Sequence, residues 1–107
     1  MRKELEQAKT IFQEELGKAG LELINLLLFG SRATEDFKGD SDWDFLVIIA
    51  QDLNRERKWE LILKIKRRLA KLKIPNDIII ESERRLAQKA RDPGQIVHYA
   101  LKQAAKI

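Results

Sequence analysis

The stretch LFGSRATEDFKGDSDWDFLVII, residues 28–49, joins a Gly-Ser step at the end of one apolar run to two aspartates at the start of the next. Side chains two apart on a strand share a face and lie roughly 6.5–7 Å apart along it. We therefore expect Asp42 and Asp44 to point toward one ion while Trp43 faces the other way. Two hard oxygen ligands on one face favour Mg²⁺, which completes its shell with waters and substrate phosphates.

The Gly-Ser step predicts a phosphate-binding elbow between a strand and a helix. Free backbone N–H groups and the positive end of the helix dipole favour a phosphate at such a place. Gly30 allows the backbone to approach the ligand closely, and Ser31 adds a hydroxyl donor and can cap a short helical turn after it. Gly-Ser is a common turn dipeptide, so the signal is weak by itself.

Four stretches of the chain have helical patterns. Apolar residues at helical spacing predict amphipathic helices over residues 3–19 and 54–73, and two further helices are expected over residues 82–90 and 91–107. The apolar stripe that the spacing predicts for the second helix consists of Trp59, Ile62, Ile65, Leu69 and Leu72.

Three short apolar runs predict buried strands, over residues 21–29, 43–50 and 77–81. The elbow lies at the carboxyl end of the first strand, and Asp42 and Asp44 lie at the amino end of the second. These ends meet only if the two strands are antiparallel neighbours. The helix between the second and third strands allows a right-handed parallel unit, which brings Asp77 to the same edge of the sheet. Three carboxylates and the elbow are then expected to converge.

The order of these features disfavours two other classes of DxD enzyme. In a phosphatase or haloacid-dehalogenase-like site the aspartates follow an apolar strand, whereas here the strand follows Asp42 and Asp44. A DxD glycosyltransferase needs an acceptor subsite, for which a chain of 107 residues has little room.

Composition restricts the remaining classes. A chain of 107 residues is expected to form one domain, residues 1–107, and its 44% hydrophobic and 36% charged residues indicate a globular, soluble protein. The absence of cysteine and the single histidine exclude a thiolate or His-rich metal site. The charged amino terminus and the lack of a long apolar run predict a cytoplasmic protein without membrane contact.

Basic residues are concentrated between residues 55 and 73, where only Glu56 and Glu60 oppose them. They are Arg55, Arg57, Lys58, Lys64, Lys66, Arg67, Arg68, Lys71 and Lys73. A solvated helix face is favoured over a nucleic-acid groove, since no aromatic residues are interleaved for base stacking. Such a face equally suits an acidic partner.

The residues GSRATEDFKGDSDWDFLVI, with Asp77 downstream, resemble the polymerase beta-like nucleotidyltransferase superfamily, and most closely its minimal nucleotidyltransferases. The resemblance extends over nearly the whole chain and implies an α/β (α+β) fold, a small mixed β-sheet flanked by helices. It implies that Gly30 and Ser31 hold the triphosphate and that Arg32 helps to neutralise phosphate charge. Trp43 and Asn76 stand where smaller or apolar residues are usual in that family, and neither replaces a ligand.

The resemblance also implies roles for the acids and a reaction. Asp42 and Asp44 would bind two Mg²⁺ ions, and Asp77 would complete the site and act as, or position, a general base. The implied reaction transfers a nucleoside monophosphate, AMP if ATP is the nucleotide, to an acceptor hydroxyl. Small standalone members are commonly paired with a helical HEPN protein as toxin and antitoxin, so the acceptor is expected on such a partner.

Alternatives remain beside these interpretations. Asp42 and Asp44 would be solvated loop residues if they stood alone, and Asp77 follows Pro75 and Asn76, where turn chemistry competes with metal binding. The same domain could also neutralise a helical toxin by contact without turnover. A nucleic-acid adaptor would show steep salt dependence of binding. The acceptor, the nucleotide preference and homo-oligomer formation stay open.

Overall fold

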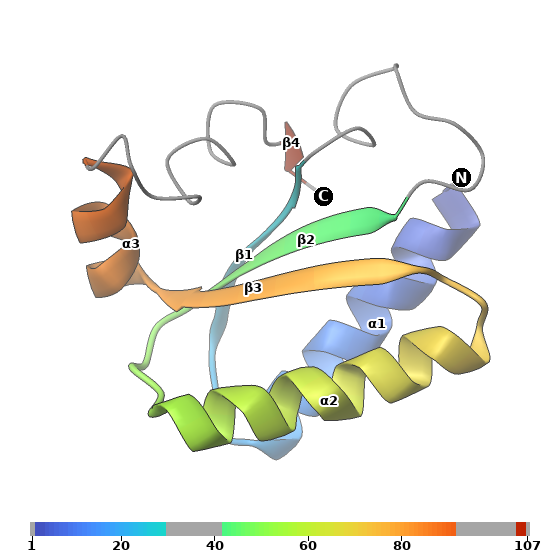
Figure 1. The fold of residues 1–107 in the computed structure, drawn as a ribbon, viewed down its shortest axis with the longest axis horizontal. Helices are drawn as coiled ribbons and strands as arrows, with labels where there is room; N and C mark the ends of the chain where they lie inside the picture. The colour runs from blue at the N-terminus through green and yellow to red at the C-terminus, as the bar shows by residue number, and fades with distance from the viewer. Residues whose placement is uncertain (1, 30–41, 92–104, 107) are drawn as a thin grey trace.

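The computed structural model describes residues 2–29, 42–91 and 105–106 (Figure 1). In chain order the elements are α1 (Arg2–Lys18), β1 (Leu23–Phe29), β2 (Trp43–Ile49), α2 (Arg55–Lys71), β3 (Asn76–Ser82), α3 (Glu83–Ala90) and β4 (Ala105–Lys106). The helices predicted at the start and middle of the chain, the helix after residue 82 and all three predicted strands are confirmed.

The strands form a mixed sheet in the order β3-β2-β1-β4. β1 pairs with β2 antiparallel, and β2 pairs with β3 parallel, with α2 as the crossover between them. Both orientations agree with the sequence-based prediction. The registers place Asp44 opposite Phe29 of β1 and opposite Asp77 of β3.

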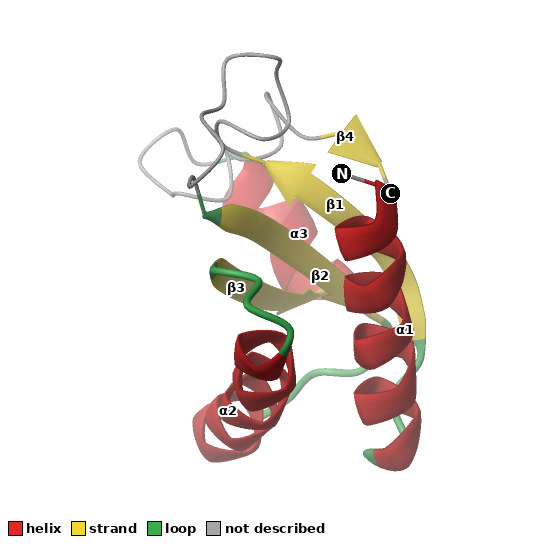
Figure 2. Cartoon of the chain, turned by 90° about the vertical axis from the view of Figure 1, so that its right-hand side faces the viewer, coloured by secondary structure: helices red, strands yellow, loops and turns green. Residues whose placement is uncertain are grey.

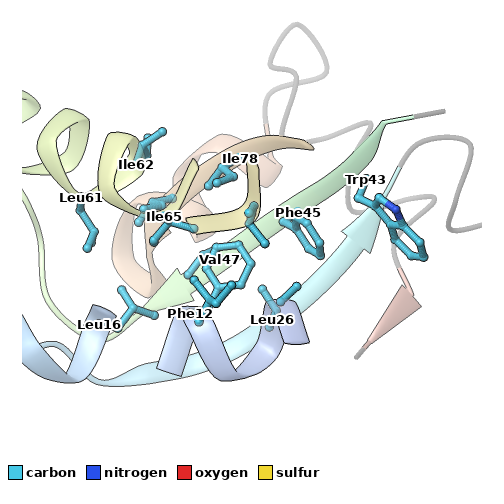
Figure 3. Close-up of a cluster of buried hydrophobic side chains, with 14 of the residues drawn as sticks. Phe12, Leu16, Leu26, Trp43, Phe45, Val47, Leu61, Ile62, Ile65 and Ile78 are labelled. Atoms are coloured by element: carbon cyan, nitrogen blue, oxygen red, sulfur yellow. The ribbon is translucent and has the colours of Figure 1, made fainter. Parts of the chain in front are cut away.

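One face of the sheet is covered by α1 and α2, which lie side by side (Figure 2). Alternate strand residues face these helices, as period-two alternation requires. Phe12 of α1 packs edge-to-face on Phe45 of β2, with ring centroids 5.1 Å apart, and Val47 and Ile65 lie in the same cluster (Figure 3). The core therefore lies between the two helices and the sheet.

The buried face of α2 differs from the predicted stripe. Leu61, Ile62, Ile65 and Leu69 are buried, whereas the prediction for Trp59 is wrong because 59% of its surface is exposed. Leu61, Ile65 and Leu69 repeat every four residues and set the inward direction. Trp59 is six residues before Ile65 and so lies about 120° around the helix from it. Leu72 is 42% exposed because the helix ends at Lys71.

Polar side chains cap two helices. The side chain of Asn54 accepts a hydrogen bond from the Arg57 N–H at 2.8 Å at the start of α2. Ser82 caps α3 in the same way, accepting from the Arg85 N–H at 3.2 Å. These bonds satisfy N–H groups that the helices themselves leave unpaired.

The last predicted helix is wrong at its end. Residues Ala105–Lys106 form β4 and pair antiparallel with Leu27 and Leu28 of β1. This pairing engages backbone groups on the side of β1 that faces away from β2, which a helix could not do. Residues 92–104 of that predicted helix lie outside the described part of the chain. Within the described residues, no helix has the length and apolar character needed to cross a bilayer.

Candidate functional site

Two aspartates occupy matching positions on neighbouring strands. Asp44 is the second residue of β2 and Asp77 the second residue of β3, and they are partners in the parallel register. Paired residues on adjacent strands share a face and are separated by about 4.8 Å between strands. Asp42 lies two residues before Asp44, immediately ahead of β2.

Burial of Trp43 fixes the direction of these side chains. Trp43 is 3% exposed and belongs to the core between the helices and the sheet. Since side chains alternate along a strand, Asp44 and its partner Asp77 lie on the opposite face from α1 and α2. The prediction that Trp43 faces away from Asp44 is thus confirmed, and an unusually large residue at this position serves the core.

The amino ends of β2 and β3 are held in place by specific hydrogen bonds. The Trp43 N–H donates to the Pro75 carbonyl at 2.8 Å, which fixes the register at its first pair. Lys66 of α2 donates from Nζ to both the carbonyl and the Oδ1 of Asn76, each at 3.1 Å. The Asn76 amide in turn donates to the Ile74 carbonyl at 3.1 Å. Asn76 is thus held on both sides, immediately before Asp77.

Sequence reasoning missed the role of Lys66. It appeared only as one of nine basic residues on a helix face, and Asn76 appeared as a turn residue and as a departure from the apolar residue usual before the third acid. The order of helix and strand did indicate a contact between Lys66 and Asn76. A helix that crosses over to a parallel strand brings its last turns close to the start of that strand. A polar residue at the start of the strand can then accept a hydrogen bond from a lysine of the helix.

The electrostatics connect the three acids. Burial, the charge of Asp77 and the charge of Asp42, in that order of size, raise the pKa of Asp44 above its usual range. Asp44 is half-buried, whereas Asp42 and Asp77 are exposed. Like charges that disfavour ionisation at one group mark a place where a cation would be stabilised.

Asp77 has one further contact. Its Oδ1 accepts a hydrogen bond from the N–H of Ile78, its chain neighbour, at 3.1 Å. The bond lies within β3, so Asp77 belongs to a strand and not to the turn that Pro75 and Asn76 suggested as an alternative. This position keeps Asp77 in register with Asp44.

The donor set is suited in type to Mg²⁺. Asp42, Asp44 and Asp77 offer only hard carboxylate oxygens, and their mutual repulsion is the condition that a divalent cation relieves. Across the described residues, no three histidine, cysteine, aspartate or glutamate side chains form a group that could hold a metal ion. The three acids therefore do not form a closed protein cage for an ion.

Gly30, Ser31 and Arg32 lie outside the described residues. Phe29, the residue before them, ends β1 opposite Asp44. The chain therefore enters the predicted elbow directly beside the acids, and the roles of these three residues remain predictions.

A family model described as polymerase beta, nucleotidyltransferase, matches residues 6–100. The chain belongs to this family. By class it is a nucleotidyltransferase. This nucleotidyltransferase has a mixed sheet, a crossover helix between β2 and β3, and acids at the start of these two strands. No curated protein matches the chain.

Two solved structures share the fold of this nucleotidyltransferase. One is a crystal structure of a toxin–antitoxin with AMP-PNP, at a TM-score of 0.51 and 22% identity, covering 91% of this chain and 69% of that one. The other is a mutant of the toxin–antitoxin MntA–HpeT, at a TM-score of 0.52 and 20% identity, covering 91% of this chain and 66% of that one. The chain therefore spans about two thirds of the length of these neighbours.

Proposed function

We propose that this nucleotidyltransferase moves a nucleoside monophosphate, AMP from ATP, to a hydroxyl group on a partner protein in a Mg²⁺-dependent reaction. The observation that carries the proposal is the pairing of Asp44 with Asp77 across β2 and β3, with Asp42 beside them and the pKa of Asp44 raised. Carboxylates that repel one another at a strand edge are suited to a cation–phosphate complex.

In the proposed step the acceptor oxygen attacks the α-phosphorus of ATP. A new phosphorus–oxygen bond forms to the acceptor, the bond to the β-phosphate bridging oxygen breaks, and pyrophosphate leaves. Asp77, the most exposed of the strand acids, takes or positions the proton of the attacking hydroxyl. Two Mg²⁺ ions held by Asp42, Asp44 and Asp77 would neutralise the triphosphate and lower the pKa of the attacking group.

Gly30, Ser31 and Arg32 are proposed to bind the triphosphate. The position of Phe29, the residue before them, opposite Asp44 supports this. Backbone N–H groups at Gly30 and Ser31 and the guanidinium of Arg32 would then neutralise phosphate charge beside the metal site.

The biological role we propose is that of a cytoplasmic antitoxin whose acceptor is a small, all-helical HEPN-type toxin. The support is that two toxin–antitoxin structures share the fold, one of them with AMP-PNP. A role in binding nucleic acid is not favoured.

The test is incubation with Mg²⁺ and α-labelled ATP, with and without a co-purified helical partner. Wild type is compared with the double variant Asp42→Asn plus Asp44→Asn, and with Glu22→Gln plus Glu60→Gln, which removes two exposed carboxylates elsewhere. We expect label on the partner with wild type and with the control pair, and none with the aspartate pair. Label that still moves with the aspartate pair would contradict the proposed site.

A second candidate is a binding module that neutralises a helical toxin by contact, without turnover. It is favoured by the absence, among the described residues, of a preformed three-acid metal group. If no label moves while the partner is still bound and neutralised, this second function replaces the first.

A further inference from the structure

The outer surface of α2 presents large apolar side chains to solvent. Trp59 is 59% exposed and Leu63 is 36% exposed, and they lie one turn apart on the helix. Leu72 is the third exposed large hydrophobic residue in the described part of the chain. An indole exposed to this degree beside a second apolar residue indicates a surface that contacts another molecule.

The indole borders a hollow. Its volume is about 590 Å³, and its lining residues are Arg55, Glu56, Lys58, Trp59 and Ile62. Lys58 also reaches Glu81 near the carboxyl end of β3, with Nζ and Oε1 3.6 Å apart. The lining residues place the hollow along the first turns of α2. We call Arg55, Trp59, Ile62, Leu63 and Arg67 the Trp59 surface.

The charge around this surface is strongly positive. Helix α2 carries eight basic residues against Glu56 and Glu60. Four of the eight make hydrogen bonds or ion pairs inside the protein: Arg57, Lys58, Lys66 and Arg68. The other four have no such partner among the described residues: Arg55, Lys64, Arg67 and Lys71. Arg55 and Arg67 lie four residues before Trp59 and four after Leu63, so cations flank both apolar side chains.

We propose that the Trp59 surface docks a partner protein whose facing surface carries an apolar pocket ringed by acidic residues. Tryptophan and arginine dominate binding energy at protein interfaces, and they stand next to each other here. The guanidinium groups of Arg55 and Arg67 have no partner within the described ranges, and negative charge on the docked protein would complement them. Single-stranded nucleic acid is less well matched, because it binds on successive aromatic platforms and Trp59 is the only exposed aromatic residue in the described segments.

The Trp59 surface is separate from the acids. Trp59 and Lys58 lie in the first turns of α2, near the carboxyl ends of β2 and β3, whereas Lys66 reaches the amino end of β3 at Asn76. The acids lie at those amino ends. Trp59 and the acids thus lie at opposite ends of β3, and the docking proposal does not rest on the proposed reaction.

The test is photo-crosslinking in cells of the source organism, with p-benzoylphenylalanine at Leu63 of the full chain. Gln13, an exposed residue of α1, is the control position. We expect Leu63 to crosslink one protein through a segment of net negative charge. Adding Trp59→Ala, or Arg55→Glu with Arg67→Glu, should lower the yield at least about 10-fold. Lys9→Glu, an exposed charge reversal on α1, should leave the yield unchanged.

Each other result overturns the proposal. One such result is no crosslink above the Gln13 control. Another is a crosslink to nucleic acid, to a second copy of this chain, or to a neutral or basic segment. The third is a crosslink yield that Trp59→Ala does not change. Urea denaturation checks that the Trp59→Ala variant is folded. We expect it to fold because Trp59 is exposed. The double variant Asp42→Asn plus Asp44→Asn should crosslink as wild type does, which separates docking from catalysis.

Discussion

The ionisation of Asp44 affects the stability of the folded protein. Burial and its neighbours Asp77 and Asp42 raise its pKa, so its ionised form is less stable in the folded protein than in the unfolded chain. In EDTA we expect Asp44→Asn to be more stable than wild type near neutral pH. The difference should shrink as pH falls through the raised pKa of Asp44 and vanish below the usual carboxyl range. Urea denaturation across this pH range measures it.

Magnesium should reverse that order. If Asp44 is a ligand, Mg²⁺ raises the melting temperature of wild type, and Asp44→Asn should need at least about 10-fold more Mg²⁺ for the same shift. Glu60→Gln, which removes an exposed carboxylate from α2, is the control. An equal response of Asp44→Asn and wild type to Mg²⁺ would remove Asp44 from the proposed metal site.

Phe45 is one of the largest fully buried side chains of the core. It is fully buried, and its ring meets Phe12 edge-to-face. Phe45→Ala should reduce the free energy of unfolding by about 3–5 kcal/mol, because it removes the buried ring and leaves a cavity. Trp59→Ala removes a larger ring from an exposed position and should change it by less than about 0.5 kcal/mol. Similar losses in the two variants would contradict the assignment of the core.

At this scale the sequence predicted the alignment of Asp44 with Asp77 better than it predicted the exposure of Trp59. Asp42, Asp44 and Asp77 could be chosen because carboxylate spacing and strand order are both visible in one chain. Trp59 could not be placed, because its apolar character and spacing also suit the core. The competing series Leu61, Ile65 and Leu69 decides which side of α2 is buried, and that depends on tertiary packing.

Among the elements, α2 connects the core to the acids through Lys66. The two hydrogen bonds from Lys66 to Asn76 hold the start of β3. Lys66→Met should weaken Mg²⁺ binding about 10-fold, as loss of an outer contact to a ligand-bearing segment does. Calorimetric titration measures the affinity. Lys64→Met removes the same charge from an exposed position of α2 and should have no effect, and Lys66→Arg should retain most of the affinity.

The pairing of β2 with β1 and β3 was predictable because the connections between the strands differ in length. A helix between β2 and β3 permits parallel pairing, and the short distance in sequence between Phe29 and Trp43 suits an antiparallel one. Strand β4 was not predictable, since two residues have no periodicity and its pairing depends on the free side of β1. The local sequence contains no information about that partner.

In the whole molecule, Arg68 ties α1 to α2. Its guanidinium donates to Glu15 at 2.9 Å and to Glu14 at 2.7 Å. Burial raises the pKa of Glu15, but the hydrogen bond from Arg68 and the charge and hydrogen bond of Lys18 outweigh burial, so this pKa lies below its usual range. The resulting stability is present above the usual carboxyl range and is lost as pH falls through the lowered pKa.

Arg68→Met should therefore reduce the free energy of unfolding near neutral pH, because it leaves the Glu15 carboxylate without its main partner. The gap between variant and wild type should close on acidification, since protonated Glu15 needs no cation. Denaturant titrations at several pH values measure this, with Arg67→Met, an exposed neighbour, as the control. A gap that stays constant with pH would assign the loss to packing alone.

The pairing of Asp44 with Asp77 is coupled to the packing of the core. A slip of one residue between β2 and β3 would set Ile78 against Asp44 and turn Ile78 and Ile80 out of the core. Burial of Ile78 and Ile80 thus favours the register that aligns Asp44 with Asp77. Exchange of an acid side chain such as Asp44→Asn leaves this register unchanged, so such a variant should keep the fold and the Trp59 surface.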